Sequence, residues 1–489
     1  MSKQRWSELS CVIVLISLII QQQIVFAQRD QSKPNILFIA VDDLNDWIGC
    51  LSGHPDAHSP NIDRLAKRGV LFTNAHCQAP ICNPSRTSFM LGLRPSTTGI
   101  YMNSPWFRST PANKARVTMT QHFAAQGYQT LTTGKIYHGS RFDAPSFQVK
   151  GPLPGQRNPL DKRLITDIGS KSKLWDFGAQ DFDEKKFNDY VDASWTIKQL
   201  KTKHNKPFFL TVGIYRPHVP FYAPTRVFKQ IPLDGVDLPT VKSDDRDDLP
   251  ETAKQVTANS TPPSHEWFVQ SGQWRKAVQS YLACVRFTDE QVGRIMKALE
   301  KSDYADNTIV VFFSDHGFHL GEKERWAKQS LWERSTRVPL IISVPKGLRN
   351  ARCDRPVELL SLFPTLAELC SIKQRPGLEG TSIVPLLKDP KAKWDRPAIT
   401  TYGQNNHAVR SDRWRYIRYN DGSEELYDHS KDPNEWKNLL HDKTGSSKEL
   451  FNVIEQHKRW LPKTNVPNAK RPQKKKSKRN TKRKGAADK

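Results

Sequence analysis

Four short apolar stretches, each followed directly by polar residues, restrict the fold of this chain more than any other feature. None contains a charged side chain, as expected for strands buried on both faces of a parallel sheet. Helices cover such a sheet, and ligands bind at the carboxyl ends of its strands. We therefore predict an α/β fold with a large, mostly parallel sheet flanked by helices. The polar residues expected to meet at one edge are Asp42 and Asp43 after residues 36–41, Lys135 and His138 after 128–133, His218 after 208–213, and Asp315 and His316 after 308–313.

Helix signals separate these strands. Residues 59–69 have Ser59 at the N-cap, Pro60 at the first helical position and Gly69 at the end, which together predict a helix. Residues 273–300 carry apolar side chains at three-to-four spacing and predict an amphipathic helix. Residues 221–270 are rich in proline, aspartate and threonine without a clear period, and we interpret them as a lid on the substrate side of the sheet.

The chain divides into four predicted segments. Residues 1–27 have a basic start, a short apolar run and a small-residue end, the pattern of a signal peptide, with an uncleaved membrane anchor as the alternative. Residues 28–386 contain the predicted sheet and form the expected main domain. Residues 387–462 alternate apolar and polar side chains around an Asn420-Asp421-Gly422 turn, which predicts a smaller α+β subdomain containing a hairpin. Residues 463–489 form a basic tail that we expect to be disordered.

Positive charge is concentrated in this tail. The formal net charge of the chain is +25, of which residues 470–489, with 11 Lys and Arg and one Asp, contribute +10. Such a tail is suited to bind a polyanion, although a solvated tail of no specific role is the more common outcome. The basic remainder suits an acidic substrate, and we expect no specific nucleic-acid binding. The six cysteines outside the signal peptide are too widely spaced for a disulfide framework or a CxxC metal site, although one or two bridges stay open.

Two pairs of residues at the predicted sheet edge have the chemistry of a metal site. Asp42 and Asp43 are adjacent carboxylates, and two ionised groups packed together are unfavourable unless a cation or a proton lies between them. Asp315 and His316 form the second pair. Carboxylates favour Ca²⁺ or Mg²⁺, whereas histidine also suits Zn²⁺ or Mn²⁺. One such pair alone is more often a solvated loop, but two pairs after matching buried strands indicate a metal site.

A second group of residues is cationic or able to transfer protons. Gathered at the same edge, these residues would form a pocket for a tetrahedral oxyanion, with imidazoles that titrate near neutral pH. Taken singly, each is more often a surface cation or a structural histidine. The group consists of Lys135, His138, His218 and Lys328.

Cys82 is the least expected residue in this setting. It lies just before a predicted helix over residues 84–91, where free N–H groups and the helix dipole favour an anion. Arg86, one helical turn on, can reach back toward it. A thiolate nucleophile and a buried inert thiol are the two interpretations. Neither explains why a thiol should share a pocket with a hard, oxygen-ligated metal.

Several sequence blocks resemble those of the sulfatase family. "CNPSRTSFMLG" matches the sulfatase signature Cys-x-Pro-Ser-Arg followed by Gly, which leaves position 83 open. "PNILFIAVDDLNDWIGC", "TTGKIYHG", "GIYRPHVPF" and "FFSDHGFHLGEKERWAKQS" resemble iduronate-2-sulfatase blocks in the same order. The resemblance runs from about residue 34 to residue 440 and implies an alkaline-phosphatase-like fold that hydrolyses sulfate esters.

In that family a formylglycine-generating enzyme oxidises the signature cysteine to Cα-formylglycine. The resemblance therefore implies that Cys82 becomes an aldehyde whose hydrate binds Ca²⁺, together with Asp42, Asp43, Asp315 and His316. It implies that Arg86 holds the hydrated aldehyde. It also assigns sulfate binding and proton transfer to Lys135, His138, His218 and Lys328. An oxygen in place of sulfur removes the mismatch between Cys82 and a hard metal.

The substrate and the compartment are expected by the same resemblance. A 2-O-sulfated iduronate or other uronate in a sulfated glycan is the expected substrate. Phe318 and Gln329 stand where lysosomal iduronate-2-sulfatases carry Trp and Tyr, and both are expected to flank the sugar pocket. The basic tail, the few cysteines and a single glycosylation sequon favour a bacterial periplasmic or extracellular enzyme over a lysosomal one. The alternatives are a formylglycine-dependent phosphonate or phosphodiester hydrolase and a non-catalytic protein that binds sulfated glycans.

Overall fold

A computed structural model describes residues 33–153, 163–170, 172, 174–258, 261–441 and 448–471. The predicted signal peptide, and the tail beyond residue 471, lie outside the described residues. Among the helices that are described, none combines the length and the apolar character needed to cross a membrane.

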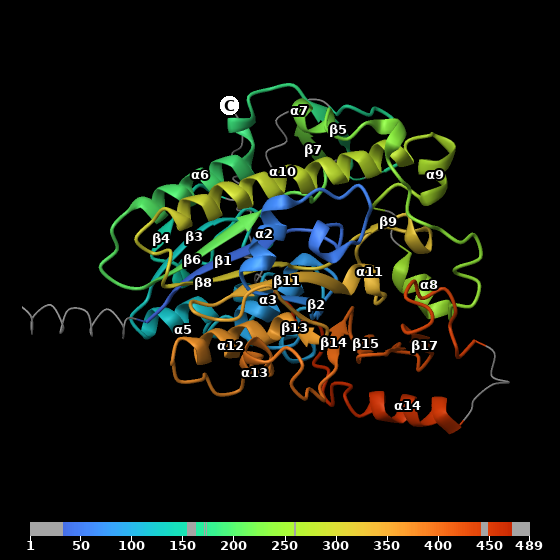
Figure 1. Cartoon of the computed structure of the whole chain (residues 1–489). Coiled ribbons are helices and arrows are strands. Elements are labelled where there is room, and N and C mark those ends of the chain that lie inside the picture. The colour runs from blue at the N-terminus through green and yellow to red at the C-terminus, as the bar shows by residue number, and fades with distance from the viewer. Residues whose placement is uncertain are drawn as a thin grey trace, which may run out of the picture.

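A mixed sheet of nine strands forms the centre of the molecule (Figure 1). The four predicted strands are neighbours within it, in the order β8 (Thr308–Ser314), β1 (Asn35–Val41), β6 (Phe208–Ile214) and β3 (Gln129–Gly134). Each pairs in parallel with the next, so their carboxyl ends lie at one edge. Every residue of β1, β6 and β8 is buried. The predicted parallel core and the common edge are confirmed.

The rest of the sheet is less regular than this core. β11 (Arg337–Ser343) is antiparallel to both β8 and β2 (Val70–His76), which makes the sheet mixed. β2 is buried throughout, yet its second half, Thr-Asn-Ala-His, breaks the apolar run, and the apolar pattern alone did not predict a strand there. Short strands complete the two sides: β12 (Ala351–Cys353) and β13 (Val357–Glu358) beside β2, and β4 (Val149–Lys150) beside β3.

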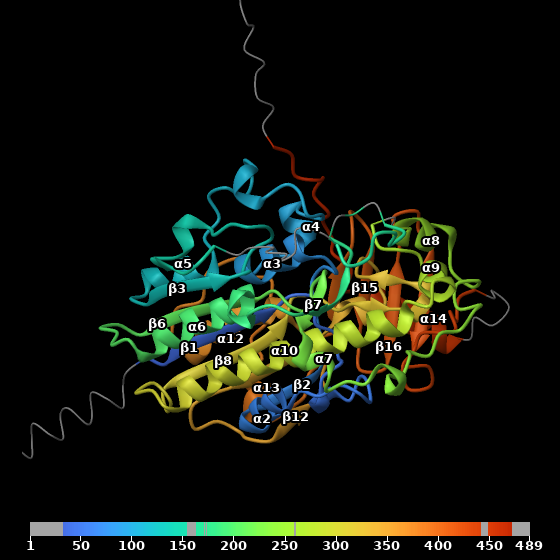
Figure 2. The same cartoon turned by 90° about the horizontal axis from the view of Figure 1, so that it is seen from above.

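Helices cover both faces of the sheet (Figures 1 and 2). One face packs against α2 (Pro60–Arg68), α6 (Asn188–Lys201) and α10 (Trp274–Glu300), and alternate β1 residues such as Leu37 and Ile39 point into this core. The other face packs against α3 (Cys82–Leu91), α5 (Met119–Ala125), α12 (Leu362–Leu369) and α13 (Val384–Lys388), with Ile36 and Phe38 of β1 in the core. The predicted helices at 59–69 and 273–300 are therefore confirmed as α2 and α10.

The start of α2 is capped from a distant helix. Ser59 occupies the N-cap position, but its hydroxyl makes no capping hydrogen bond and donates to Asp63 instead. The carboxylate of Asp289, on α10, accepts hydrogen bonds from the backbone N–H groups of Asn61 (2.9 Å) and Ile62 (2.8 Å). The free N–H groups of the first turn are thus satisfied by a partner that no local pattern reveals.

Residues 221–270 do not form one long loop, as the lid interpretation assumed. β7 (Phe221–Pro224) pairs with β5 (Phe177–Gln180), and three short helices follow: α7 (Thr225–Phe228), α8 (Glu251–Thr257) and α9 (His265–Gln270). Phe221 and Tyr222 are fully buried in the main core. The start of this segment is therefore a fixed part of the structure.

The C-terminal part contains a four-stranded antiparallel sheet: β14 (Ala398–Thr401), β15 (His407–Arg410), β16 (Trp414–Arg418) and β17 (Glu424–Asp428), accompanied by α14 (Lys448–Lys458). β16 and β17 form the predicted hairpin, and Gly422 adopts a φ of 89° in its turn. The predicted boundary at residue 386 falls inside α13, and the division into domains stays a prediction.

The first residues of the predicted tail are placed against the catalytic core. We call residues 463–471 the strap. Within it, the backbone N–H groups of Val466 and Ala469 donate to the carbonyl oxygens of Ser96 and Gly99, at 2.9 Å each. Gly99 ends α4 (Pro95–Thr98) with a φ of 69°, and a Cβ at this position would lie 2.5 Å from the Pro467 oxygen. The expectation that disorder begins at residue 463 is wrong for the strap.

Candidate active site

The ends of the four parallel strands bring the predicted residues into one buried cluster. Asp42 and Asp43 follow β1, Asp315 and His316 follow β8, and Lys135 and His218 follow β3 and β6. The first four are fully buried, and Lys135 and His218 retain 4% and 6% of their exposure. Because parallel strands end at the same edge, residues far apart in the sequence meet here.

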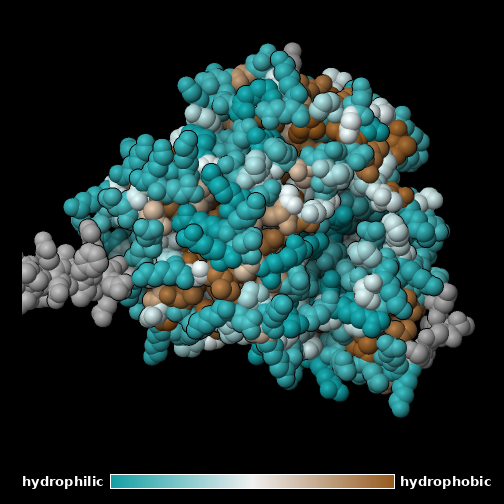
Figure 3. Space-filling view, in the orientation of Figure 1, coloured by the Kyte–Doolittle hydropathy of each residue, from teal (hydrophilic) through white to brown (hydrophobic). Residues whose placement is uncertain are grey.

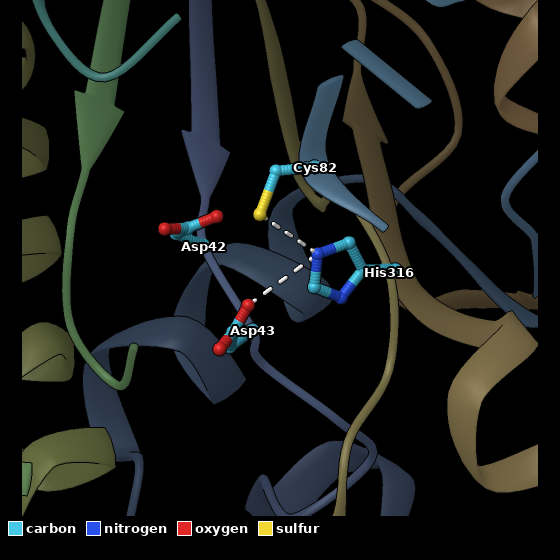
Figure 4. A group of neighbouring side chains, drawn as sticks. All are labelled: Asp42, Asp43, Cys82 and His316. Atoms are coloured by element: carbon cyan, nitrogen blue, oxygen red, sulfur yellow. Dashed lines mark hydrogen bonds and ion pairs between the residues drawn. The ribbon is translucent and has the colours of Figure 1, made fainter. Parts of the chain in front are cut away.

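Cys82 is the first residue of α3, whereas we expected the helix to start at Pro84. The backbone carbonyl of Ile81 accepts the hydrogen bond of the Ser85 N–H, so the first turn begins at the cysteine itself. Every residue of α3 is buried, and its N-terminus points Cys82 into the carboxylate cluster (Figure 4). Burial and helix position place the thiol where an anion or a polarised oxygen is stabilised.

Arg86 lies one turn farther along α3 and links the ends of three strands. Its Nε donates to Asp315 Oδ2 at 2.7 Å, and a terminal nitrogen donates to Asp42 Oδ1 at 3.0 Å. Its other terminal nitrogen donates to the backbone oxygens of Lys135 and Ile136. The guanidinium therefore holds three strand ends together, and the contact with a hydrated aldehyde that the resemblance implies stays a prediction.

Four ligand-type atoms lie close together around Cys82 (Figure 4). One atom each from Asp42, Asp43, Cys82 and His316 lie within 4.8 Å of one another. His316 Nε2 lies 3.3 Å from Cys82 Sγ and 3.4 Å from Asp43 Oδ1. Asp315 adjoins this group, 3.5 Å from His316 Nε2, but its carboxylate accepts from Arg86 and from the Asp43 N–H.

Burial and neighbouring charges shift the pKa values of the two adjacent carboxyls in opposite directions. Although burial opposes ionisation, the charges of Lys135, His218 and Arg86 hold the pKa of Asp42 well below its usual range. Burial raises the pKa of Asp43 to about 7, against the charge of Lys328 and with the help of Asp42. Two carboxyls that cannot both ionise easily without more positive charge make a site suited to a cation.

The donor set fits a divalent cation. The Nδ1–H of His316 donates to the Gly317 carbonyl at 3.0 Å, which fixes the ring so that Nε2 faces Asp43 and Cys82. A histidine fixed in this way is a typical metal ligand. Two carboxylates favour a hard ion such as Ca²⁺ or Mg²⁺, and sulfur at position 82 is the only soft atom in the group.

The remaining candidates surround this group. Lys135 pairs with Asp42, and its Nζ lies 3.9 Å from Cys82 Sγ. Lys328 Nζ pairs with both oxygens of Asp43, at 2.5 and 2.8 Å. His218 Nε2 lies 3.9 Å from a carboxylate oxygen of each aspartate, and its Nδ1–H donates to the Val219 carbonyl. Lys135, Lys328 and His218 thus lie around the same centre, and the charge of Lys135 also acts on His138.

His138 is held neutral. Burial and the charge of Lys135 lower its pKa to about 3. Its Nδ1 is buried and has no hydrogen-bond partner among the described residues. A neutral imidazole with a free ring nitrogen can accept a proton.

One expectation about a neighbouring residue needs correction, and a second residue makes contacts that the signature does not predict. Phe318 is fully buried among aromatic side chains, with its ring centroid 5.8 Å from those of Phe221 and Tyr281, so it belongs to the core and lines no open sugar pocket. Asn83 occupies the position that the signature leaves open, and it is hydrogen-bonded. Its side-chain amide donates to the carbonyls of Met102 (2.9 Å) and Pro105 (3.0 Å) and anchors that segment beside Cys82.

The cysteines form no disulfide in the part of the chain that the structure describes, where all six after the signal peptide are free. Cys50 is partly buried and the other five are buried. Local spacing had left one or two bridges open, and the described structure contains neither.

The fold and the site together define an α/β protein of the alkaline-phosphatase-like type, with a group of metal-ligand residues at the edge of its parallel core. The sulfatase family model matches residues 34–372, and a model for the C-terminal region of N-sulphoglucosamine sulphohydrolase matches residues 321–460. The chain therefore belongs to the sulfatase family, and it is a sulfuric ester hydrolase.

Three known proteins illustrate the similarity. A sulfatase of Formosa agariphila is 42% identical over 458 residues, 90% of this chain and 88% of its own. Iduronate 2-sulfatase of Mus musculus is 33% identical over 419 residues, 76% and 75% of the two chains. The solved phosphonate monoester hydrolase of Agrobacterium radiobacter shares the fold, with a TM-score of 0.72 at 20% identity over 87% of this chain and 94% of its own.

Proposed function

We propose that this protein removes sulfate esters from a sulfated carbohydrate, and that the ester is the 2-O-sulfate of an iduronate or a related uronate. The 33% identity to iduronate 2-sulfatase over three quarters of both chains supports this substrate. We further propose that Cys82 acts as Cα-formylglycine and that the bound cation is Ca²⁺.

One observation carries the proposal. The Cys82 side chain is fully buried and lies among two carboxylates, a histidine and two lysines. Sulfur is a poor partner for the hard cation that Asp42 and Asp43 favour. A hydrated aldehyde at the same position places an oxygen there, and the whole donor set then suits one ion.

The other residues divide the remaining work. A hydrated aldehyde at position 82 would supply the nucleophilic oxygen, and a cation held by Asp42, Asp43 and His316 would lower the pKa of that oxygen. Lys135, which is buried, and Lys328, which is partly buried, bind the oxygens of the sulfate group and stabilise the negative charge that builds up on them. Lys328 or His218 delivers a proton to the departing sugar oxygen. His138, whose Nδ1 has no hydrogen-bond partner among the described residues, would accept the proton of the second hydroxyl of the hydrate when sulfate is released.

Maturation and location follow from the same assignment. A formylglycine-generating enzyme has to reach Cys82, whose side chain is fully enclosed in the folded protein. We therefore propose that this partner acts on the chain before folding is complete. We also propose that the protein is exported to the periplasm or the medium of a bacterium, and that the basic tail binds a polyanion.

The test combines mass spectrometry with kinetics. The protein is produced with a formylglycine-generating enzyme, and the peptide that contains residue 82 is weighed. We expect the mass of the aldehyde or its hydrate, turnover of 2-O-sulfated uronate disaccharides, loss of turnover with EDTA and recovery with Ca²⁺. An unmodified cysteine in a fully active protein would overturn the nucleophile. Faster cleavage of aryl phosphodiesters than of aryl sulfates would favour phosphodiester hydrolysis instead.

A further inference from the structure

Two surface segments start at the active site and meet at Trp106. The first is tied to the residue after Cys82, because the Asn83 amide donates to the carbonyls of Met102 and Pro105, and the Asn83 N–H donates to Asn103 Oδ1 at 3.2 Å. Met102, Asn103 and Ser104 are exposed, so this segment lies at the surface while it is hydrogen-bonded to the residue next to the buried Cys82. Trp106 comes directly after Pro105 and is partly exposed.

The second segment leaves the other side of the site. It runs from Lys135 through Tyr137 and His138 to Arg141. The Tyr137 ring meets the Trp106 ring edge-on, with centroids 5.0 Å apart and an interplanar angle of 85°. Phe107 packs against the same indole at 4.4 Å. The indole is thus held in place by aromatic neighbours while part of it stays open to solvent. Partly exposed apolar side chains of this kind are scattered among the polar ones that dominate the face shown in Figure 3.

Arg141 lies over this indole with its charge uncompensated. Its guanidinium carbon is 5.4 Å from the centre of the Trp106 ring. The guanidinium folds back toward the backbone of Gly139, since a Cβ at that residue would lie 3.5 Å from Arg141 Nε. Arg141 is exposed and forms no ion pair with any carboxylate in the part of the chain that the structure describes.

The nearest acidic residue in sequence does not serve Arg141. Asp143 is engaged by Arg108, whose nitrogens donate to its two oxygens at 2.9 and 2.7 Å. Arg108 and Asp143 form a closed pair, whereas Arg141 has five N–H donors that can bind an anion from outside the chain. A planar guanidinium recognises a carboxylate with two parallel hydrogen bonds, which an ammonium cannot do.

We propose that Trp106 and Arg141 form a subsite that binds the carboxylate-bearing sugar ring of the substrate, with the ring against the indole and its carboxylate on the guanidinium. This inference rests on the proposed function and adds the residues that would select a uronate over a neutral sugar. The sulfate group then enters the buried cluster, while the acidic group of the same sugar stays at the rim. Neither residue takes part in the chemical step.

The experiment compares two substrates that differ at one group. The first is a 2-O-sulfated uronate disaccharide, and the second is the same disaccharide with its carboxylate reduced to a hydroxymethyl group. 4-Nitrophenyl sulfate reports on the catalytic centre. Arg141→Gln should lower kcat/KM for the first substrate by about 10- to 100-fold, the usual range for a lost charged hydrogen bond, and leave the other two within about 2-fold. Arg141→Lys should recover only part of the loss.

Controls separate this role from a structural one. Arg349, an exposed arginine after β11, provides a matched control. Arg349→Gln should leave the ratios of kcat/KM among the three substrates unchanged. Trp106→Ala should weaken both disaccharides and spare 4-nitrophenyl sulfate. Equal losses on all three substrates, or an unchanged preference for the uronate in Arg141→Gln, would overturn the subsite alone. A wild-type protein that cleaves 4-nitrophenyl sulfate but neither disaccharide would overturn the uronate substrate and the subsite with it.

Discussion

Asp192 offers a direct test of how burial controls charge in this fold. It lies on α6, retains 4% of its exposure, and its Oδ1 accepts a hydrogen bond from Thr133 Oγ1 at 2.6 Å. No cation pairs with it among the described residues, and Asp189, one turn earlier, adds negative charge. Burial raises its pKa to about 8, against the hydrogen bond from Thr133.

The sign of the effect follows from proton binding. An aspartate in the unfolded chain has a pKa of about 3.9. Between that value and 8, folded Asp192 keeps a proton that the unfolded chain has lost, so its contribution to stability falls as the pH rises. Asp192→Asn removes the titration and keeps an oxygen that can accept from Thr133. The free energy of unfolding of the variant relative to wild type should therefore rise by about 1.4 kcal/mol per pH unit, or about 2.7 kcal/mol between pH 5 and pH 7.

Urea unfolding followed by tryptophan fluorescence measures this difference at each pH. Asp181→Asn, a change at an exposed position before α6, measures how much of the difference comes from removing one negative charge from the surface. A difference that stays constant or shrinks from pH 5 to pH 7 would show that Asp192 is ionised in the folded protein, and the reasoning would be wrong.

Three further outcomes are expected. Arg86→Met should lower the stability of the metal-free protein by about 3–5 kcal/mol in thermal denaturation, because Asp42 and Asp315 lose a buried counter-ion; an unchanged melting temperature would contradict this. Lys135→Met should lower kcat/KM for 4-nitrophenyl sulfate by about 10²- to 10³-fold, whereas a loss below about 3-fold would exclude charge stabilisation by this residue. Truncation after Arg471 keeps the strap and should leave 4-nitrophenyl sulfate turnover unchanged while it weakens salt-sensitive binding to a sulfated polysaccharide; unchanged binding would remove the tail as an anchor.

The site could be predicted because its residues follow strands that a simple rule places side by side. The apolar stretches before Asp42, Lys135, His218 and Asp315 read as buried parallel strands, and parallel strands end at one edge. The rule needs only local sequence and the handedness of crossover connections. The order of the four strands is not required, because their carboxyl ends lie at the same edge of a parallel sheet in any order.

Contacts between distant segments could not be predicted in this way. β2 is buried by its neighbours β11 and β12 although half of it is polar. Asp289 caps α2 from 228 residues away, and the strap binds α4 from the far end of the chain. Each contact satisfies backbone groups that local sequence leaves open, and no local pattern names the partner.

The burial of Phe318 moves the question of substrate preference to another part of the molecule. Phe318 follows the Asp-His-Gly motif at a position where the lysosomal enzymes carry Trp, and this difference suggested an altered sugar pocket. Its ring instead packs between Phe221 and Tyr281, where a change of aromatic size alters core packing and makes no contact with a sugar at the surface. The exposed side chains that lead out of the site belong to the segment after Tyr101 and the segment after His138. Differences in preference between this protein and its relatives should therefore be sought there, beginning with Trp106 and Arg141.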